Sequence, residues 1–330
     1  MKGQLWCCLR TRSRRPVCHR ILCKPAINLL RYTGAVRRLI VNADDFGLTS
    51  GVNRAIAEAQ QKGVVTSMTL MASSRAFEHA ASWAQLPLSQ GRSFSVGCHI
   101  VLLDGEPLLP AEDVPSLLQN GASKGAYLRE NLSDFVVASF RGKLSPDEVE
   151  GEASAQIERI QRAGIQPSHF DTHKHAHMFP AVLRPLLRAA RAHRLPAVRN
   201  PFGPVWPLPF GNLVRTPKAW KRLAQLNVLR GFAANFRREV AAHGLRATDG
   251  SVGVLVTGVL DLELFAAIIR SIPEGTWEFV CHPGYNDAEL DSVKTRLRQS
   301  REQELRLLTS PEAKALLQGN GIELISYREL

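Results

Sequence analysis

The sequence predicts an α/β protein with a parallel sheet in one domain, arranged either as an irregular barrel or as a doubly wound sheet. From residue 38 onward, short apolar runs alternate with segments of helical periodicity. The number of such units suits a single domain of this length. A third observation bears on function, because carboxylate and imidazole side chains follow several of the apolar runs.

The first half of the predicted domain alternates regularly between strand and helix. RLIVNA at 38–43 is typical of a buried parallel strand, and Thr49 or Ser50 can cap the helix after it. Ser145 can cap a later helix whose first position is Pro146. The predicted order is a strand at 38–43, a helix from about 50 to Gly63, strands at 64–72 and 93–102, a polar loop at 104–121, and helices at about 129–141 and 145–164.

The second half begins with the polar, histidine-rich run PSHFDTHKHAHMF, which predicts another strand. A stretch rich in Pro and Gly then indicates a loop or lid before the alternation resumes. The predicted order is a strand at 167–179, a helix from near Pro180, a short strand at 197–199, the loop or lid at 200–217, helices within 218–244, strands at 248–254, 276–282 and 322–327, and helices at about 261–271, 291–306 and after Ser310.

The formal charge of +12 is concentrated at the N-terminus. Residues 1–38 hold ten Lys and Arg and no Asp or Glu, and subtracting these ten leaves +2 for residues 39–330. We therefore expect a basic, Cys-containing segment at 1–38 and one catalytic domain at 39–330.

Three interpretations of residues 1–38 compete. The segment can be a basic arm for nucleic acid or anionic lipid, or a metal knuckle built from Cys7, Cys8, Cys18 and Cys23 with His19. The Cys and His spacing fits no common zinc pattern. We favour the third interpretation, a segment that is disordered or not part of the native protein, because a valine start codon at Val36 would begin the chain just before the first strand.

The remaining cysteines, Cys98 and Cys281, are too few for a disulfide framework, so we expect a reducing compartment, the cytoplasm. No apolar run reaches the ~20 residues that span a bilayer. The N-terminus is also unlike a signal peptide, since arginines directly follow its short apolar run. A homodimer is the oligomeric state we expect by default.

Polar side chains gather where the predicted strands end, which is where sites form in both parallel architectures. Each has an ordinary explanation when taken alone: His99 as a hydrogen-bonded core histidine, Asp44 as a turn residue, Asp45 as a helix cap, and HPG at 282–284 as a turn. Their joint occurrence at successive strand ends favours a functional site. The residues concerned are Asp44, Asp45, His99, Asp171, His173 and His282.

The run HFDTHKHAH places acid and imidazole at every second residue. In an extended strand, alternate residues point to one face, so this run predicts a histidine ladder suited to metal binding for as long as the strand continues. The members are His169, Asp171, His173, His175 and His177, of which the later ones can lie in the following loop. For His79, His193 and His243, which fall on or near predicted helices, we expect surface positions.

These residues resemble the YdjC-like carbohydrate deacetylases, which include the chito-oligosaccharide deacetylases. The matching segments are LIVNADDFG, GVVTSMTLM, VGCHIVLLDGEPL, HFDTHKHAHMFP and CHPGY, and the likeness runs from about Leu39 to the final YREL. The resemblance implies an irregular TIM-like (β/α) barrel and one divalent metal ion, Mg or Zn, held by Asp45, His99 and His173. It also implies that Asp44 is the neighbouring base, and His282 matches the late active-site histidine of the family.

The resemblance further implies a hydrolase of carbohydrate metabolism that removes acetyl groups from N-acetylated sugars. One acid and two histidines leave coordination positions open, as in a catalytic metal site. Asp44 would take a proton from water and His282 would return one to the leaving amine. Around the ligands or the substrate we expect Asp171, His175, His177 and Arg199. Arg199 either contacts the acetyl oxygen or sugar hydroxyls or is a surface arginine. The aromatic residues Tyr127, Phe202 and Trp206 either stack on sugar rings or pack within a lid.

Two other classes compete with this prediction. Another metal hydrolase on a similar barrel, such as a phosphoesterase or an amidohydrolase, often uses two metal ions. A nucleic-acid or anionic-surface binding protein would act through the basic arm, with salt-dependent binding that is lost when residues 1–38 are deleted. We expect an acetylated sugar, chito-oligosaccharide-like or glycolipid-linked, and no nucleic acid as the partner.

Overall fold

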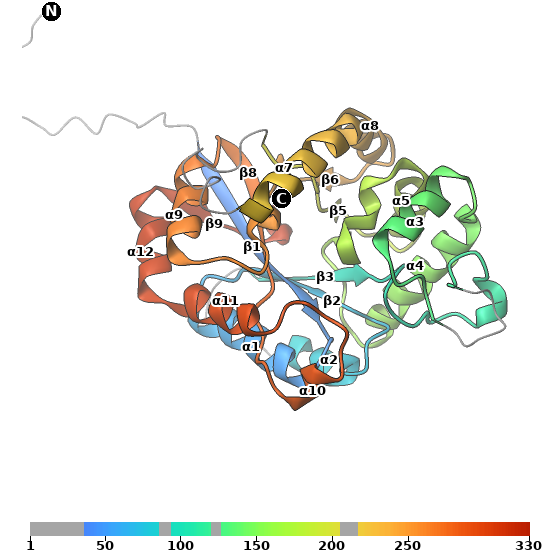
Figure 1. The fold of residues 1–330 in the computed structure, drawn as a ribbon, viewed down its shortest axis with the longest axis horizontal. Helices are drawn as coiled ribbons and strands as arrows, with labels where there is room; N and C mark the ends of the chain where they lie inside the picture. The colour runs from blue at the N-terminus through green and yellow to red at the C-terminus, as the bar shows by residue number, and fades with distance from the viewer. Residues whose placement is uncertain (1–35, 86–93, 120–126, 205–216) are drawn as a thin grey trace, which may run out of the picture. The chain divides into compact units, whose positions relative to one another are not determined.

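The computed structural model describes residues 36–85, 94–119, 127–204 and 217–330, and these ranges form one parallel sheet surrounded by helices (Figure 1). The predictions for residues 1–35 and for Trp206 lie outside the described residues and stay predictions. The strands are β1 (Arg37–Phe46), β2 (Ser67–Leu70), β3 (Ser95–Ile100), β4 (Phe170–Thr172), β5 (Ala197–Val198), β6 (Arg246–Ala247), β7 (Gly250–Val252), β8 (Gly275–Cys281) and β9 (Ile322–Leu324).

The sheet curls into a nearly closed barrel, which confirms the predicted TIM-like architecture. The strand order is β6-β5-β4-β3-β2-β1-β8-β7, with parallel pairing throughout, and β9 pairs with the beginning of β1. The path ends at β6 and β7, which follow each other in the chain. Hydrogen bonds link the chain at β6 and β7 to the segment after β5. The Asn200 side-chain amide donates to the Thr248 carbonyl at 3.1 Å, and Ser251 N–H donates to the Phe202 carbonyl at 3.2 Å.

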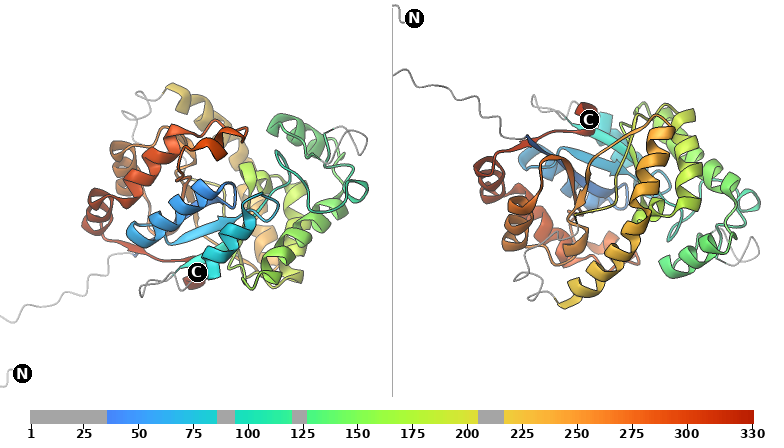
Figure 2. Two further views of the ribbon diagram at one scale, coloured as in Figure 1. Left: turned by 90° about the horizontal axis from the view of Figure 1, so that it is seen from below. Right: turned by 90° about the horizontal axis from the view of Figure 1, so that it is seen from above.

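Helices cover the outside of the barrel in Figure 1 and in both views of Figure 2. The α-helices are α1 (Ser50–Lys62), α2 (Phe77–Gln85), α3 (Leu132–Phe140), α4 (Pro146–Arg162), α5 (Pro180–Ala192), α7 (Pro217–Leu229), α8 (Ala233–Ala242), α9 (Leu262–Ser271), α10 (Ala288–Asp291), α11 (Gln299–Thr309) and α12 (Pro311–Gly319). The 3₁₀ helices are η1 (Ala111–Asp113), η2 (His173–Met178), η3 (Arg230–Phe232), η4 (Val254–Val256) and η5 (Tyr327–Glu329).

Short polar side chains begin several of these helices as the sequence predicts. The Thr49 hydroxyl accepts from Val52 N–H at 3.1 Å at the start of α1, and the Ser145 hydroxyl accepts from Glu148 N–H at 3.4 Å at the start of α4. Such bonds satisfy backbone donors that have no partner within the helix. The caps therefore mark the first turns of α1 and α4.

Several predicted elements are wrong in extent. The strand expected at 322–327 is β9 and ends at Leu324, the strand expected at 248–254 is β7 and spans only Gly250–Val252, and two others bear on the site. The helix expected at 291–306 begins only at α11, because the Arg298 guanidinium binds the carbonyls of Leu290 and Val293 and holds the preceding segment irregular. The strand expected at 167–179 ends at Thr172, where η2 begins. Its later histidines therefore do not continue the ladder.

The first strand is buried on both faces, as parallel strands covered by helices are. Every residue of β1 from Leu39 to Phe46 is buried, and Gly47 follows with a φ of +102°. A Cβ at Gly47 would lie 3.0 Å from the Met71 carbonyl oxygen, so this turn requires glycine. The turn brings the two aspartates of the DDFG segment to the rim.

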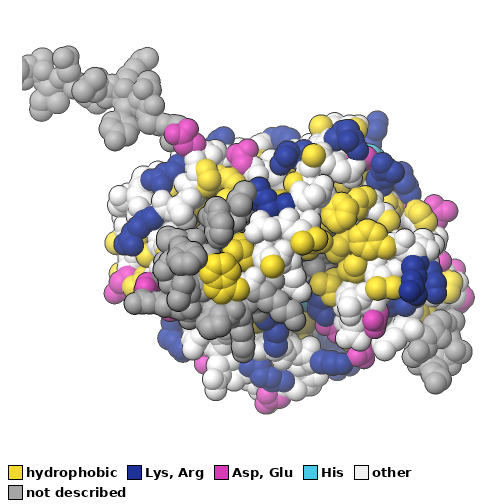
Figure 3. Space-filling model, turned by 45° about the horizontal axis from the view of Figure 1, so that its top comes forward, with side chains coloured by type: hydrophobic (Ala, Val, Ile, Leu, Met, Phe, Trp, Pro, Cys, Tyr) yellow, Lys and Arg dark blue, Asp and Glu magenta, His cyan; other side chains and the backbone are white. Residues whose placement is uncertain are grey.

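The surface shown in Figure 3 carries charges of both signs, with Asp and Glu standing among Lys and Arg and with exposed hydrophobic side chains between them. Exposed apolar residues of the described chain include Val137, Phe140, Trp220 and Val228. This mixture agrees with the near-neutral balance of residues 39–330. In the ranges that the structure describes, no helix is long and apolar enough to cross a membrane.

Candidate metal centre

The carboxyl end of β1 turns both of its aspartates inward. Adjacent residues of a regular strand point to opposite faces, but the pairing of β1 with β2 shifts register between Ala43 and Phe46, and Asp45 has a φ of +68°. Asp44 and Asp45 are consequently both buried. This local irregularity places two carboxylates in one site.

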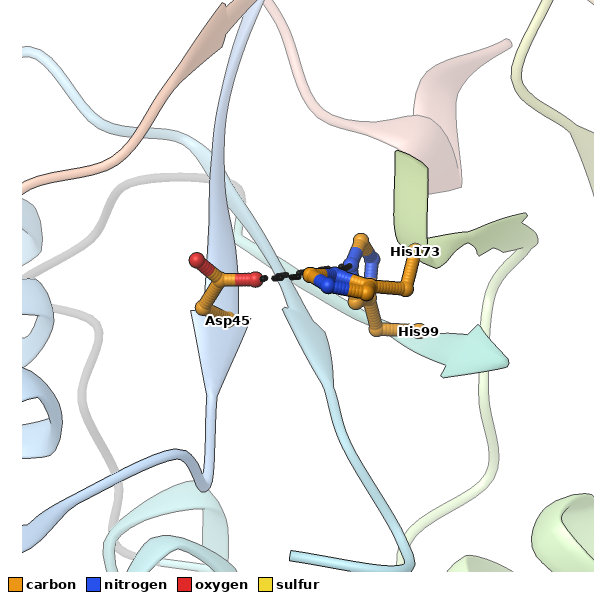
Figure 4. A group of neighbouring side chains, drawn as sticks. All are labelled: Asp45, His99 and His173. Carbon is orange, nitrogen blue, oxygen red and sulfur yellow. Dashed lines mark hydrogen bonds and ion pairs between the residues drawn. The ribbon is translucent and has the colours of Figure 1, made fainter. Parts of the chain in front are cut away.

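Asp45, His99 and His173 direct one donor atom each toward a common point (Figure 4). Asp45 Oδ1 lies 3.5 Å from His99 Nε2 and 3.6 Å from His173 Nδ1, and the two ring nitrogens lie 3.4 Å apart. Bonds of about 2.1 Å to a tetrahedral zinc ion separate neighbouring donor atoms by roughly 3.4 Å. The three side chains therefore fit a metal ion and leave further coordination positions open.

The neighbours of His99 and Asp45 hold these two side chains in the orientation that a ligand needs. His99 Nδ1 lies 2.8 Å from Asp171 Oδ1, so with a metal bound Nδ1–H donates to this carboxylate and the Nε2 lone pair faces the centre. Arg301 Nη2 donates to Asp45 Oδ2 at 2.6 Å, which leaves Oδ1 for a cation. The sequence gives no signal for Arg301, which lies on the otherwise ordinary amphipathic helix α11.

Arg199 is completely buried and binds three carboxylates. It donates to both oxygens of Asp44, at 2.8 and 2.6 Å, and to Glu278 Oε1 at 2.9 Å, and it also pairs with Asp171. These contacts use all five N–H donors of its guanidinium. Arg199 is therefore not a surface arginine, and its donors are committed to carboxylates rather than to the acetyl oxygen or sugar hydroxyls.

A second group of possible donors, Asp44, His99 and Asp171, overlaps the first. The carboxylates of Asp44 and Asp171 are both occupied by Arg199, and His99 Nδ1 already faces Asp171. A cation among these three groups would have to compete with a buried guanidinium. The described residues therefore favour the Asp45 group as the metal site.

The carboxylates buried around the centre outnumber the guanidinium groups that face them. Four carboxylates, those of Asp44, Asp45, Asp171 and Glu278, face two guanidinium groups, those of Arg199 and Arg301. The excess of two negative charges equals the charge of one divalent ion. Buried charges are costly unless compensated. Without a metal ion, a protonated His99 supplies one of the missing positive charges, because its pKa is raised to about 9, so the count agrees with a bound cation and adds to the donor distances.

Electrostatics keeps Asp44 ionised. Burial alone would raise the pKa of the Asp44 carboxyl, but the Arg199 guanidinium, which donates two hydrogen bonds to it, holds that pKa well below its usual range. Burial would lower the pKa of His99, but the carboxylates of Asp171, Asp44 and Asp45 raise this pKa to about 9 when no metal is present. Asp44 is thus a carboxylate at neutral pH.

His282 lies beside Asp44 at the end of β8. Its Nε2 is 3.9 Å from Asp44 Oδ2, and its Nδ1 is buried with no partner among the described residues. Burial lowers the pKa of His282 to about 4, although Asp44 and Asp45 oppose this shift. Its backbone N–H donates to Glu304 Oε2 at 2.6 Å. His282 is therefore a neutral imidazole that lies beside the Asp44 carboxylate, at a separation longer than a hydrogen bond.

The remaining predicted residues divide between the site and the core. His177 Nδ1 lies 2.7 Å from the Thr172 hydroxyl, and the His177 ring lies near that of Phe236. His177 therefore belongs to the turn after β4 and not to the predicted histidine ladder. His175 Nδ1 is buried without a partner in the described chain. Phe202 is buried against Phe236, which supports packing over sugar stacking, whereas Tyr127 is partly exposed.

Backbone strain concentrates at this rim. Among the described non-glycine residues, Asp45, Asp104, Lys174 and His175 have positive φ angles, and so does Arg194 at the end of α5. Such conformations cost free energy and are enriched at functional sites. Four of these five residues lie on β1 or on the segments that follow β3 and β4, at the end of the barrel that carries the site.

Comparisons with known proteins find relatives over most of the chain. The sequence model of the YdjC-like protein family matches residues 38–319. The chain is 37% identical over 294 residues to a carbohydrate deacetylase of Geobacillus stearothermophilus, covering 89% of this chain and 98% of that protein. It is 32% identical over 298 residues to a chitooligosaccharide deacetylase of Serratia marcescens, covering 88% and 98%.

A crystal structure from Enterococcus faecalis V583, provisionally described as that of a cellobiose-phosphate cleavage protein, has a similar fold. It superimposes with a TM-score of 0.70 at 26% sequence identity, covering 89% of this chain and 99% of that one. The sequence match and this likeness both extend over most of the barrel. The chain therefore belongs to the YdjC-like protein family.

Proposed function

We propose that this protein is a metal-dependent carbohydrate deacetylase, which hydrolyses the amide of an N-acetylated sugar and releases acetate. Similarity to relatives named carbohydrate deacetylase and chitooligosaccharide deacetylase supports the reaction class. The observation that carries the proposal is the donor triangle of Asp45, His99 and His173, with the ionised Asp44 beside it. Substrate would be an N-acetylated sugar of the chito-oligosaccharide or glycolipid-linked kind.

Asp45, His99 and His173 would hold the metal ion. When bound, such an ion makes a water molecule more acidic and polarises the acetyl carbonyl. Of the two ions expected, zinc suits a site with two imidazoles better than magnesium, which prefers oxygen ligands in octahedral geometry. The donor separations of 3.4 to 3.6 Å also fit tetrahedral zinc.

Two side chains would handle the protons. Asp44 Oδ2 takes a proton from the attacking water, and Arg199 keeps the carboxylate ionised and oriented for that step. His282 Nε2, 3.9 Å away and neutral beforehand, receives this proton and donates it to the sugar nitrogen as the amide C–N bond breaks. Asp44 and His282 thus act as one relay from water to leaving amine.

The competing metal hydrolases differ in metal number. The overlap between the two possible donor groups, and the occupation of the second by Arg199, favour one ion over two. A single ion suits amide hydrolysis as proposed here. A two-metal phosphoesterase or amidohydrolase would need Asp44 and Asp171 as further metal ligands, and both carboxylates are bound by the Arg199 guanidinium.

The experiment that tests the function measures acetate release from di-N-acetylchitobiose and a panel of N-acetylated sugars, with and without a chelator. We expect acetate from at least one sugar, loss of that activity with chelator, and recovery on adding zinc. Phosphate monoesters serve as the contrasting substrates. Phosphate release without acetate release would contradict the proposal and support a phosphoesterase.

A further inference from the structure

A chain of buried hydrogen bonds leads from the floor of the barrel to Asp44. We propose that Tyr327, on η5, is a positioning residue for the reaction: it holds Glu278, Glu278 holds Arg199, and Arg199 fixes the Asp44 carboxylate. This inference rests on the proposed deacetylase function. It concerns side chains that lie outside the donor triangle and do not touch the metal.

The contacts in this chain are short and continuous. The Tyr327 hydroxyl donates to Glu278 Oε2 at 2.5 Å, and the other oxygen, Oε1, accepts from Arg199 Nε at 2.9 Å and lies 2.7 Å from Nη2. Arg199 then donates both Nη groups to Asp44. Tyr327, Glu278 and Arg199 are each fully buried. Both oxygens of Glu278 therefore depend on these two partners.

Tyr327 is itself held rigidly. Its ring stacks on His169 with centroids 3.5 Å apart and planes within 9°, and its backbone N–H donates to the Ser95 hydroxyl at 3.1 Å. Gly97 leaves room for this stack, because a Cβ there would collide with the His169 ring. These contacts do not involve the hydroxyl, so the ring should keep its position in a Tyr327→Phe variant.

Stability alone does not explain Glu278. A buried ion pair is no more stabilising than well-packed apolar side chains of similar volume, and Glu278 lies within the otherwise apolar run of β8. Arg199 already has Asp44 and Asp171 as anionic partners. What Glu278 adds is a third anchor that sets the angle at which the guanidinium meets Asp44.

Removing the Tyr327 hydroxyl would take away the partner of Glu278 Oε2 at a fully buried position. The carboxylate would then turn toward the Arg199 N–H groups or take up a proton, and either change alters how Arg199 holds Asp44. Asp44 handles a proton and does not bind the sugar. The expected effect is therefore on kcat and not on KM.

The test compares Tyr327→Phe with Tyr285→Phe in the full chain. Tyr285 is the matched control, because its hydroxyl also binds a glutamate, Glu58, but at the surface. We expect Tyr327→Phe to lower kcat for acetate release by about tenfold, with KM, bound metal and melting temperature close to those of the parent. Tyr285→Phe should leave all four unchanged.

Glu278→Gln tests the route of the effect. If Tyr327 acts through Glu278, adding Tyr327→Phe to the Glu278→Gln variant should lower kcat much less than it does in the parent. An unchanged kcat in Tyr327→Phe, a loss matched by Tyr285→Phe, or full additivity with Glu278→Gln would each overturn the proposal. A kcat loss that only follows loss of metal would overturn it as well.

A readout without turnover separates this proposal from the proposed function. The Arg199 Nε–H signal in a ¹⁵N NMR spectrum, assigned by its absence in Arg199→Lys, should shift in Tyr327→Phe and not in Tyr285→Phe. If the parent releases no acetate but the signal shifts, the deacetylase function fails while the positioning contact stands. An unshifted signal overturns the positioning role whatever the activity.

Discussion

Asp44 and Asp45 are neighbours in the chain but have different partners. Asp44 faces Arg199 and His282, whereas Asp45 faces His99, His173 and Arg301. The register shift in β1 and the positive φ of Asp45 produce this division. One carboxylate is therefore free to bind a cation while the other stays beside it as a proton acceptor.

The two aspartates should respond differently to the same substitution. Asp44→Asn removes the proton acceptor and should lower kcat by about a hundredfold or more, with bound metal near the parent level. Asp45→Asn removes a ligand and should lose both metal and activity, as should His99→Ala and His173→Ala. Metal analysis alongside acetate release checks this. Metal loss in Asp44→Asn with retention in Asp45→Asn would reverse the two roles.

The segment after β4 shows how a single element decides the ligand geometry. The strand ends at Thr172, and Lys174 and His175 adopt φ angles of +54° and +55°, which turns the chain within η2. The Thr172 hydroxyl accepts from His177 N–H at 3.1 Å and contacts the His177 ring. This small bonded turn places His173 opposite His99.

Thr172→Val should loosen that turn without changing any ligand. The valine has the same shape but cannot bond His177, so His173 loses its support, and we expect metal affinity to fall roughly tenfold. Thr172→Ser keeps the hydroxyl and should bind metal as the parent does. Competition with a chelating dye measures both. Equal affinity in the Val and Ser variants would show that the turn does not depend on this contact.

The sequence predicts the elements and their polar ends better than it predicts irregular backbone. Apolar runs and caps locate β1, α1 and α4, and the side chains at strand ends identify Asp45, His99 and His173 as neighbours. Glu278 is visible only as a charge within an apolar run. Arg301 and Tyr327 have no local signal, because their importance depends on contacts 256 and 49 residues away in the chain.

For the molecule as a whole, the buried charges link stability to pH. Glu304 is buried on α11, and burial raises its pKa to about 7, although the His282 N–H and Arg301 oppose the shift. The folded protein therefore binds this proton more tightly than the unfolded chain, whose ordinary value is 4.5. Its contribution favours folding at low pH and is lost as pH rises from about 4.5 to 7.

Glu304→Gln should remove this dependence. In metal-free protein, the free energy of unfolding of the parent should fall relative to that of the variant as pH rises. The difference between them should change by up to about 3 kcal/mol between roughly pH 5 and pH 8. Glu323→Gln, at an exposed position, is the control and should follow the parent. Parallel stability curves for Glu304→Gln and the parent would contradict the assignment.

The proposed deacetylase function depends most directly on one metal ion per chain. The decisive measurement is a titration of chelator-treated protein with zinc, following bound metal and acetate release together. We predict that acetate release rises in proportion to bound zinc and stops rising at one ion per chain. Activity that needs two ions per chain, or that persists without any, would contradict the single-ion centre of Asp45, His99 and His173.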